Sequence, residues 1–431
     1  MASNEDRIGR FLRRLLQRRS ALEIVQSLAR DERPIPRRIP GGSSVSDEDV
    51  ESRWQLLEVA ETSKRALYDR AQPEALEPYR QNIENCIGTV KVPVGLAGPL
   101  RIRGMFASGD FYIPLATTEA ALVASYARGA RAITEAGGCV SILLHEGMRR
   151  TPGFALRSLT ESGLFAIWCM EKSDALRAAA AATTRHGELI DIGMAVEGNH
   201  VYLILDYTTG DASGQNMVTI ATEAVCEYIM QNATVRPEYF FVEANLSGDK
   251  KATAHSFVTV RGKKVSAEVT LPSDLVASRL RTTPKELERY WKMSAIGAIQ
   301  SGSIGVQGHF ANALAALYIA CGQDPACVAE SAVGVTRFDV TESGDLYASV
   351  TLPSIVVGTV GGATALPSQH ACLEIMGLAG DRKAQALAEV CAGLALAGEL
   401  SITAALCSGD FTRAHQKLAR GNGAAGRGDH R

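Results

Sequence analysis

The sequence lacks several features that would assign it to a common functional class. Its 431 residues carry 45 basic and 47 acidic side chains, and the formal net charge of −2 gives no reason to expect nucleic acid as a partner. The nine cysteines form no Cys-x-x-Cys pair, which indicates reduced thiols in a cytosolic compartment. Because none of them lies in a zinc-like Cys/His array, no metal site is expected.

The chain also has no recognisable secretory signal and no uninterrupted membrane-spanning run. The N-terminus lacks an apolar core followed by small residues. The longest uncharged stretch, residues 346–373, is interrupted by Pro353, Pro367 and three glycines, which a spanning helix would avoid. We therefore expect a soluble, cytoplasmic protein.

A dinucleotide fingerprint is missing as well. The pattern Gly-x-Gly-x-x-Gly occurs once, at Gly421, Gly423 and Gly426, but no strand precedes it and the chain ends five residues later. We interpret this segment as a flexible tail, so that a nucleotide would have to bind without a Rossmann fingerprint.

The N-terminal part of the chain is predicted to be helical. Residues 1–20 hold six arginines among apolar residues at helical spacing, which indicates either a solvated basic helix or one that touches anionic lipid or a partner. Helices are expected over 21–29 and about 50–70, with a loop rich in Gly and Ser over 40–49 between them.

The rest of the chain mixes strands and helices. An Ala-rich helix is expected over 118–134, ended by Gly137 and Gly138. Between 152 and 243 a small α+β module with its own periodicity is predicted. Its expected strands are 164–170 and 201–205, and its expected helices are 173–183 and 217–232. Beyond it we expect paired strands at 254–260 and 264–270 and helices near 284–299, 310–321 and 384–407.

Two segments could bind or stabilise negative charge. The small-residue turn at 211–217 runs into a helix, where backbone N–H groups can approach a pyrophosphate, although an N-cap by Asp211 or Ser213 explains it equally well. Lys250 follows a Ser-Gly turn and could stabilise an oxyanion, although a solvated charge cluster is the commoner reason for such a lysine.

Three further polar residues are ambiguous when they are taken singly. Glu119 begins an apolar helix, where the helix dipole alone favours an acid. Asp324 follows an apolar helix, and His415 lies in a polar helix near the C-terminus. None of these residues assigns a function without the others.

Taken in order, the motifs of the chain resemble those of class I hydroxymethylglutaryl-CoA reductases, the biosynthetic branch of that family. The most specific are Thr-Gly-Asp-Ala-Ser-Gly-Gln-Asn-Met at 209–217, Asp-Lys-Lys at 249–251 and Gly-Gln-Asp at 322–324. The resemblance extends over about 80–418. The other matching segments are 84–88, 93–100, 116–119, 122–125, 308–312, 351–355, 358–362 and 398–401.

The resemblance implies an α/β (α+β) fold and a domain division. A large domain around a long central helix would bind the acyl-CoA, and the insert would be a ferredoxin-like NADP-binding domain. The family is dimeric with an active site shared across the interface, so a homodimer or a tetramer of two dimers is expected, with 84–88 as the dimer-forming segment. The expected parts are an N-terminal helical region at 1–75, the large domain at 76–151 and 244–431, and the insert at 152–243.

The resemblance also implies roles for single residues. Lys250 would stabilise the oxyanion formed when hydride adds to the thioester carbonyl, and Glu119 would protonate the intermediate. Asp324 would raise the proton affinity of both, because it places an anion beside them. His415 would protonate the departing CoA thiolate, a role that suits a group titrating near neutral pH.

Substrate and cofactor contacts follow from the same resemblance. Arg185 and Arg281 lie near positions where the family places cations for a 2′-phosphate, which favours NADPH as the cofactor. The substrate-binding positions are Ser125, Arg150, Asp249, Lys251, His309 and Asn312. The cofactor-binding positions are Arg128, Arg131, Arg185, Asp211, Ala212, Gly214, Asn216 and Arg281.

The implied reaction is the four-electron reduction of hydroxymethylglutaryl-CoA to mevalonate and CoA. Glu243 departs from the pattern, because animal members carry a serine that touches the substrate there. Two alternatives stay open at this point. One is the reverse, catabolic oxidation of mevalonate with NAD, and the other is a non-catalytic relative that binds acyl-CoA.

Overall fold

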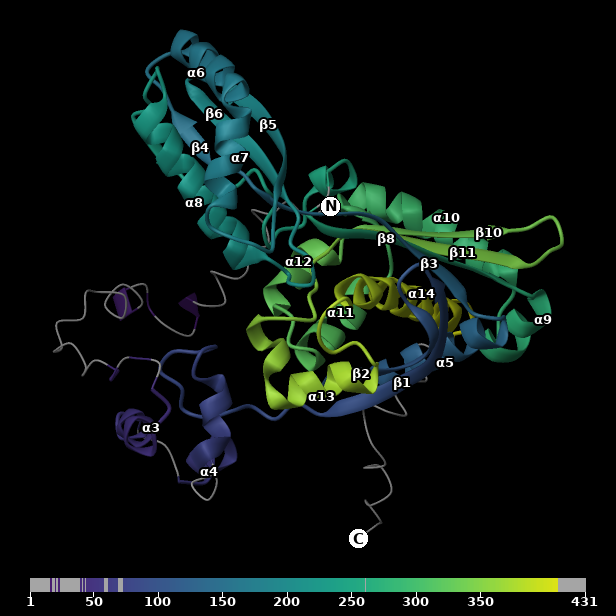
Figure 1. Ribbon diagram of the computed structural model, residues 1–431. Helices are drawn as coiled ribbons and strands as arrows, with labels where there is room; N and C mark the ends of the chain where they lie inside the picture. Colours follow the sequence, from purple (N-terminus) through teal and green to yellow (C-terminus); the bar gives the residue numbers. More distant parts are fainter. Residues whose placement is uncertain are drawn as a thin grey trace. The chain divides into compact units, whose positions relative to one another are not determined.

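The computed structural model describes residues 16–17, 20, 22–23, 39–40, 42, 44–57, 61–68, 73–259 and 261–409 (Figure 1). The chain divides into two compact units, Met1–Thr89 and Val90–Arg431. The helices expected over 1–20 and 21–29 lie almost wholly outside the described residues, as do His415 and the glycine-rich tail.

The described part of the first unit is helical. Its elements are α3 (Asp47–Trp54), α4 (Glu61–Leu67) and the 3-10 helix η1 (Pro73–Tyr79), so the single helix expected over 50–70 is wrong. The Ser46 hydroxyl caps α3 by accepting the Asp49 N–H, and the helix therefore begins inside the stretch predicted as loop. A small apolar cluster holds this unit together; it consists of Val45, Val50, Trp54, Tyr68, Leu76 and Cys86.

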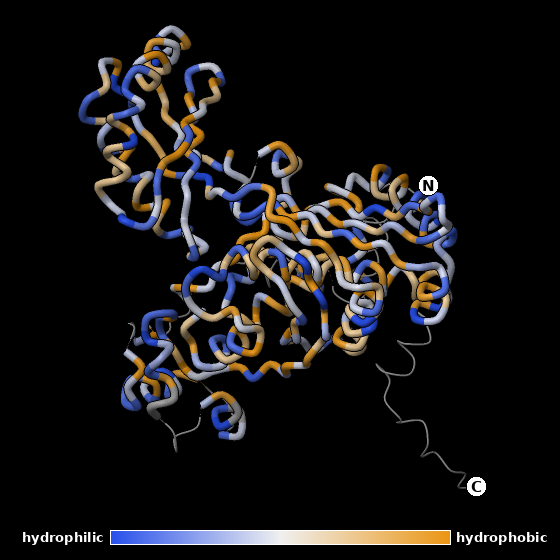
Figure 2. Tube along the Cα trace, turned by 45° about the vertical axis from the view of Figure 1, so that its right-hand side comes forward, coloured by the Kyte–Doolittle hydropathy of each residue, from blue (hydrophilic) through white to orange (hydrophobic). Residues whose placement is uncertain are grey.

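The second unit is a mixed α/β structure built on one extended sheet. The strand order is β7-β4-β6-β3-β8-β11-β10-β9, with β1 and β2 attached through β3 and β5 attached through β6. Hydrophobic and hydrophilic residues alternate along the large strands (Figure 2), and burial alternates in the same way along β8. The strands are β1 Val94–Gly104, β2 Ser108–Ala116, β3 Cys139–Arg150, β4 Gly153–Ala155, β5 Leu189–Glu197, β6 His200–Tyr207, β7 Tyr239–Phe241, β8 Gly262–Leu271, β9 Gly305–Val306, β10 Gly334–Val340 and β11 Leu346–Ile355.

The expected long central helix is confirmed as α14 (Ala384–Cys407), which packs against β3, β8, β11 and α5 (Leu122–Glu135). Among the described residues it is the one helix long and apolar enough to cross a membrane, but 83% of its most apolar window is buried inside the protein, as in a core helix. Gly129 of α5 lies against the backbone of Ala397, where a Cβ would overlap the carbonyl oxygen. This glycine lets the two helices approach closely.

Residues 152–243 contribute the order β4, α6 (Leu159–Glu171), α7 (Ser173–Ala181), β5, β6, α8 (Gln215–Asn232) and β7. Their strands pair antiparallel in the order β7-β4-β6-β5. The predicted helices at 173–183 and 217–232 and the strand at 201–205 are confirmed. The strand expected at 164–170 is wrong, because the Ser158 hydroxyl caps a helix there and Phe165, Trp168 and Cys169 form its buried face.

The strand expected at 254–260 is also wrong. Ala254–Phe257 forms the 3-10 helix η2, and the strand that was expected to pair with it, β8, already has neighbours on both edges, β3 and β11. The helices expected near 284–299 and 310–321 are confirmed as α10 and α11. The helix expected over 118–134 is α5, but it begins only at Leu122, so Glu119 precedes this helix instead of beginning it. The remaining helices are α9 Ser273–Leu275, η3 Val276–Leu280, α10 Pro284–Ser301, α11 Phe310–Ala320, η4 Pro325–Cys327, α12 Val328–Ser331, η5 Gly362–Ala365 and α13 Pro367–Ile375.

Candidate active site

Lys250 and Asp324, which lie 74 positions apart in the sequence, form an ion pair with Nζ 2.9 Å from Oδ2. Lys250 lies in the loop after β7, and Asp324 follows α11. The hydrogen bond that Lys250 donates to the Asp324 carboxylate raises the pKa of Lys250. Burial is the largest single influence and opposes ionisation of Asp324, but the hydrogen bonds from Lys250 and from the Ala326 N–H, together with the charge of Lys250, outweigh it and keep the pKa of Asp324 below its usual value. The site therefore holds an ammonium group and a carboxylate at neutral pH.

This ion pair opens onto a cavity of about 440 Å³ that is also lined by the small-residue turn at 212–217. Helix α8 begins at the end of that turn, with Gly214 as its N-cap at φ 76° and with no side chain capping it. The backbone N–H groups at the start of this 18-residue helix are therefore available to an anion. The predicted residues Ala212, Gly214 and Asn216 all line the cavity.

Asp211, unlike these neighbours, does not line the cavity. Its carboxylate accepts the backbone N–H groups of Arg382, Lys383 and Ala384 at the start of α14. It therefore anchors the turn to the central helix, and the alternative that Asp211 or Ser213 caps α8 is wrong.

The loop at 356–359 supports the turn from the other side. Gly358 lies against the backbone of Ala212 and Ser213, where a Cβ would come within 2.5 Å of the Ser213 nitrogen. The Thr359 N–H donates to the Asp211 carbonyl oxygen at 2.9 Å. A glycine is therefore required at 358 for this close contact.

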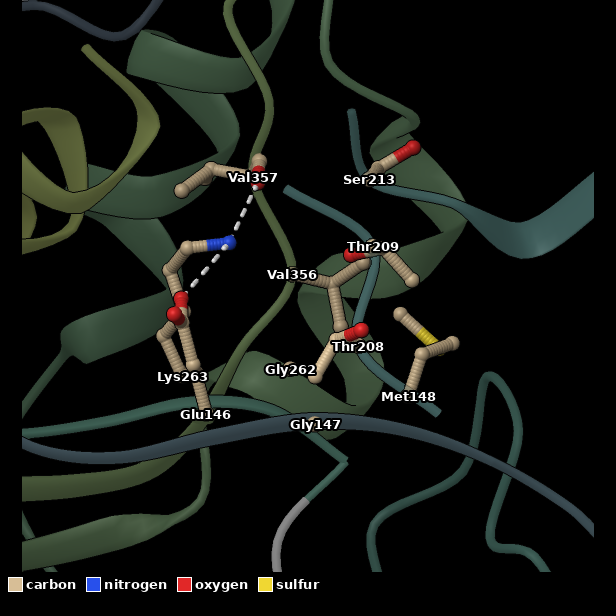
Figure 3. Close-up of a pocket in the computed structure, with 10 residues that line it drawn as sticks. All are labelled: Glu146, Gly147, Met148, Thr208, Thr209, Ser213, Gly262, Lys263, Val356 and Val357. Atoms are coloured by element: carbon tan, nitrogen blue, oxygen red, sulfur yellow. Dashed lines mark hydrogen bonds and ion pairs between the residues drawn. The ribbon is translucent and has the colours of Figure 1, made fainter. Parts of the chain in front are cut away.

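A buried lysine holds the same loop, and sequence reasoning missed it because Lys263 was assigned to a turn between two strands. Lys263 is 3% exposed, and its Nζ donates to the Val357 carbonyl oxygen at 3.3 Å and lies 4.0 Å from Glu146 (Figure 3). Burial lowers the pKa of Lys263, while Glu146 opposes this shift. The small pocket around Lys263 is also lined by Thr208, Thr209 and Ser213, next to the turn.

A second group of predicted residues gathers at the N-terminal end of α11. The Asn312 amide donates to Glu119 Oε2 at 2.9 Å. His309 contacts the Tyr126 hydroxyl at 3.3 Å and lies 3.6 Å from the buried Glu399. Burial lowers the pKa of His309, although Glu399 opposes this shift.

Ser125 and Arg128 extend this group along α5. The Ser125 hydroxyl lies 2.9 Å from the Ser401 hydroxyl, and Arg128 donates to the Ser401 carbonyl oxygen at 2.6 Å. The resemblance placed Ser125 with the substrate and Arg128 with the cofactor, and both residues meet at this one serine of α14.

The two groups lie at opposite ends of α11. Asn312, which binds Glu119, is in the first turn of this helix, and Asp324, which binds Lys250, follows its last turn. An 11-residue helix is about 16.5 Å long. One chain therefore pairs Lys250 with Asp324 and Glu119 with Asn312, but it does not bring Glu119 to Lys250.

The predicted carboxylate-binding residues are joined by ion pairs. Arg150 Nη1 lies 2.6 Å from Asp249 and 3.5 Å from Glu243, and Lys251 Nζ donates to the Asp249 carbonyl oxygen at 2.8 Å. Burial opposes ionisation of Asp249, but Arg150 and Arg261 keep its pKa below the usual value. Arg261 and Glu330, which complete this cluster, were also missed by sequence reasoning.

The remaining predicted cofactor residues lie on other elements. Arg131 pairs with Glu135 in α5 at 2.8 Å. Arg185 is exposed in the connection between α7 and β5, and Arg281 has φ 57° after η3. Within the described residues, no three His, Cys, Asp or Glu side chains are arranged to hold a metal ion.

Comparison with known proteins identifies the family of this chain. Residues 49–420 match the model of the family described as hydroxymethylglutaryl-coenzyme A reductase. The 3-hydroxy-3-methylglutaryl-coenzyme A reductase of Pyrococcus horikoshii is 46% identical over 349 residues, which cover 79% of this chain and 84% of the relative. That of Aeropyrum pernix is 45% identical over 351 residues, covering 80% and 83%.

Solved structures agree with the fold. The class II 3-hydroxy-3-methylglutaryl-CoA reductase from Streptococcus pneumoniae, bound to NADPH in open conformations, matches with a TM-score of 0.62 at 18% sequence identity. The match covers 80% of this chain and 95% of that structure. At this identity the likeness supports the mixed α/β fold alone.

Proposed function

The chain belongs to the hydroxymethylglutaryl-coenzyme A reductase family and reduces hydroxymethylglutaryl-CoA to mevalonate with a nicotinamide cofactor, and from this premise we propose that it is an NADPH-dependent biosynthetic enzyme in which Lys250 is the oxyanion stabiliser. The observation that carries the proposal is that Lys250 and Asp324 line the same cavity as the uncapped N-terminus of α8.

The cofactor fits the residues of this cavity. A pyrophosphate needs backbone N–H donors and a close approach, and Ala212, Ser213 and Gly214 offer both at the start of α8. The bound cofactor would supply one hydride in each of the two reduction steps. Arg185 and Arg281 carry the positive charge that would favour a 2′-phosphate, and thus NADPH over NADH.

Lys250 acts at the thioester carbonyl. As hydride reaches the carbonyl carbon, negative charge grows on the oxygen, and the Lys250 ammonium group donates a hydrogen bond to it. Asp324 keeps Lys250 protonated, because its carboxylate raises the pKa of Lys250. Glu119 delivers the proton to oxygen, and His415 protonates the CoA thiolate. Arg150 and Lys251 hold the carboxylate of the substrate, and Asp249 positions Arg150 beside it.

The proposed catalytic unit is a homodimer or a pair of dimers. Glu119 and Lys250 lie at opposite ends of α11 in one chain, so a site that contains both needs Glu119 from a second copy. A symmetric dimer forms two such sites at once.

We also propose the domain roles. Residues 152–243 would be a ferredoxin-like cofactor domain, which their β-α-α-β-β-α-β order and the strand order β7-β4-β6-β5 support. Residues 76–151 and 244–431 would bind the acyl-CoA, and 1–75 would form a helical extension. The nine free thiols, eight of them buried, support a reducing, cytoplasmic location.

The test is loss of the reduced nicotinamide absorbance in the presence of hydroxymethylglutaryl-CoA, comparing NADPH with NADH. We expect two NADPH consumed for each CoA released, and a fall of about 100- to 1,000-fold in kcat for Lys250→Ala. Lys172→Ala, at an exposed lysine between α6 and α7, is the matched control. A preference for NADH would favour the catabolic direction. Folded protein without turnover would favour an acyl-CoA-binding relative.

A further inference from the structure

The backbone of Lys250 is held in an unfavourable conformation. Its φ is 56°, in the left-handed region that residues other than Gly, Asn and Asp rarely adopt. Such conformations persist only where the surroundings fix them, and they occur preferentially at functional sites. The contacts that fix the Lys250 backbone therefore bear on where its ammonium group lies during the proposed reaction.

A buried carboxylate receives the Lys250 backbone. The Lys250 N–H donates to Glu330 Oε1 at 3.2 Å, and the Glu330 side chain is 4% exposed. Glu330 belongs to the short α12. It contacts the main chain of Lys250, whereas Asp324 contacts the side-chain Nζ. Two acids from one stretch of chain, 324–330, thus hold both ends of this lysine.

Arg261 ties Glu330 to the residue before Lys250. Arg261 Nη1 lies 2.5 Å from Glu330, and Nη2 lies 2.6 Å from Asp249. The contacts close a ring from Asp249 through Arg261 and Glu330 to the Lys250 N–H and back along the chain. This ring fixes two consecutive residues of the loop.

The location of this ring makes a purely structural role a poor explanation. Arg261 and Glu330 are each 4% exposed at the side chain, and desolvating such ions costs as much as their attraction returns. Apolar residues of the same size would therefore fill this space at no loss of stability. The ion cluster therefore contributes by fixing the backbone of the loop at 249–250 and not by adding stability.

We propose that Arg261 and Glu330 are positioning residues for the reduction: they set the backbone of Lys250 so that its Nζ points into the cavity beside Asp324. The inference rests on the proposed function, because it takes Lys250 as the oxyanion stabiliser. Neither residue lines the cavity at 212–217 and 322–325, so Glu330 acts through Lys250, and Arg261 acts through Glu330 and Asp249.

The experiment compares Glu330→Met, Arg261→Met and the double variant with wild-type full-length protein. Each single variant should lower kcat about 10- to 100-fold, because the donor is misplaced. In Glu330→Met both KM values should change less than about threefold, whereas Arg261→Met also removes a partner of Asp249 and should in addition raise KM for hydroxymethylglutaryl-CoA. The double variant should be no less active than the single variants, because the two residues act as one unit.

Measuring Tm beside kcat distinguishes a misplaced Lys250 from a destabilised fold. A single variant leaves a buried charge with one partner removed, so its Tm should fall, whereas the double variant should recover Tm without recovering kcat. Glu389→Gln is the matched control, because Glu389 is fully buried and binds backbone N–H groups of 106–107 far along the chain. It should lower Tm and leave kcat unchanged. Glu330→Gln, which keeps an acceptor for the Lys250 N–H, should be intermediate and serves if Glu330→Met does not fold.

Amide hydrogen exchange of residues 247–251 gives a readout that needs no activity. Exchange there should be faster in Glu330→Met and in the double variant, and unchanged in Glu389→Gln. The proposal is overturned if this exchange does not change, if folded Glu330→Met keeps kcat within about twofold of wild type, or if recovery of Tm restores kcat. Turnover by Lys250→Ala would instead overturn the proposed function, and that variant alone would reveal it.

Discussion

The Lys263 ammonium group donates to the carbonyl oxygen of Val357, one residue before the glycine that packs on the small-residue turn at 211–217. This buried charge has its nearest carboxylate, Glu146, only at 4.0 Å. Desolvation therefore costs more than these contacts return, and we expect Lys263→Met to leave the free energy of unfolding unchanged or to raise it by up to about 2 kcal/mol. The same variant should raise KM for NADPH, because the loop under the turn loses its anchor. Lys264→Met, at the next residue of β8, is the control.

The pH dependence of this difference has a defined sign. Burial lowers the pKa of Lys263, so between its folded and unfolded pKa values the unfolded chain binds more protons. The stability of the wild type should therefore rise with pH in that window, and the advantage of Lys263→Met should shrink. A difference between the two proteins that is independent of pH up to the alkaline limit of folding would contradict this assignment.

Gly129 tests the packing of α5 on α14. A Cβ there would overlap the Ala397 carbonyl oxygen, and a helix backbone cannot move aside as a flexible side chain can. Gly129→Ala should lower the free energy of unfolding by about 1–3 kcal/mol. Gly163→Ala in α6, where nothing lies within 4 Å, should instead stabilise the protein by up to about 1 kcal/mol. Chemical denaturation of both variants measures the contrast, and equal effects would rule out the close contact.

Asp324 should control the alkaline limb of the pH–rate profile. The hydrogen bond that its carboxylate accepts from Lys250 raises the pKa of Lys250, so Asp324→Asn should return that pKa toward its ordinary value. The fall of kcat at alkaline pH should then begin at lower pH in the variant than in the wild type. An unshifted limb would mean that another group limits the reaction there.

The same pair contributes to acid stability. The net effect of its surroundings lowers the pKa of Asp324, so its contribution to stability is present above the unfolded pKa and is lost as pH falls through the folded pKa. Wild type and Asp324→Asn should therefore converge in stability on acidification. Urea denaturation at a series of acidic pH values measures this convergence.

The local sequence pattern predicted some helices and strands correctly and others wrongly, and each wrong prediction has a physical cause. The long, mostly apolar segment at 384–407, which contains Glu389 and Glu399, indicated a helix, and α14 has those bounds. The apolar run at 164–170 was too short to separate strand from helix, and the cap at Ser158 decided it. The strand expected at 254–260 failed because β8 takes both of its partners from distant parts of the chain.

The candidate site shows the same limit of prediction from local sequence. Lys250, Asp324, Glu119 and Asn312 were found because they lie in specific motifs, and the contacts between them span 74 and 193 positions. Lys263 and Glu330 carry no motif of their own. Their significance comes from burial and from partners such as Val357 and Lys250, which sequence spacing does not reveal.

Subunit mixing tests the shared site most directly. If each site takes Glu119 from one chain and Lys250 from the other, a dimer of Glu119→Gln with Lys250→Ala has one doubly defective site and one intact site. Random exchange of two inactive variants should then restore about a quarter of wild-type activity, because half of the dimers are mixed and half of their sites are intact. Mixing Lys250→Ala with Asp324→Asn should give no more activity than the two variants have separately, because that ion pair forms within one chain, so no site in the mixed dimer is intact. Recovery in the second mixture, or none in the first despite proven exchange, would exclude this arrangement.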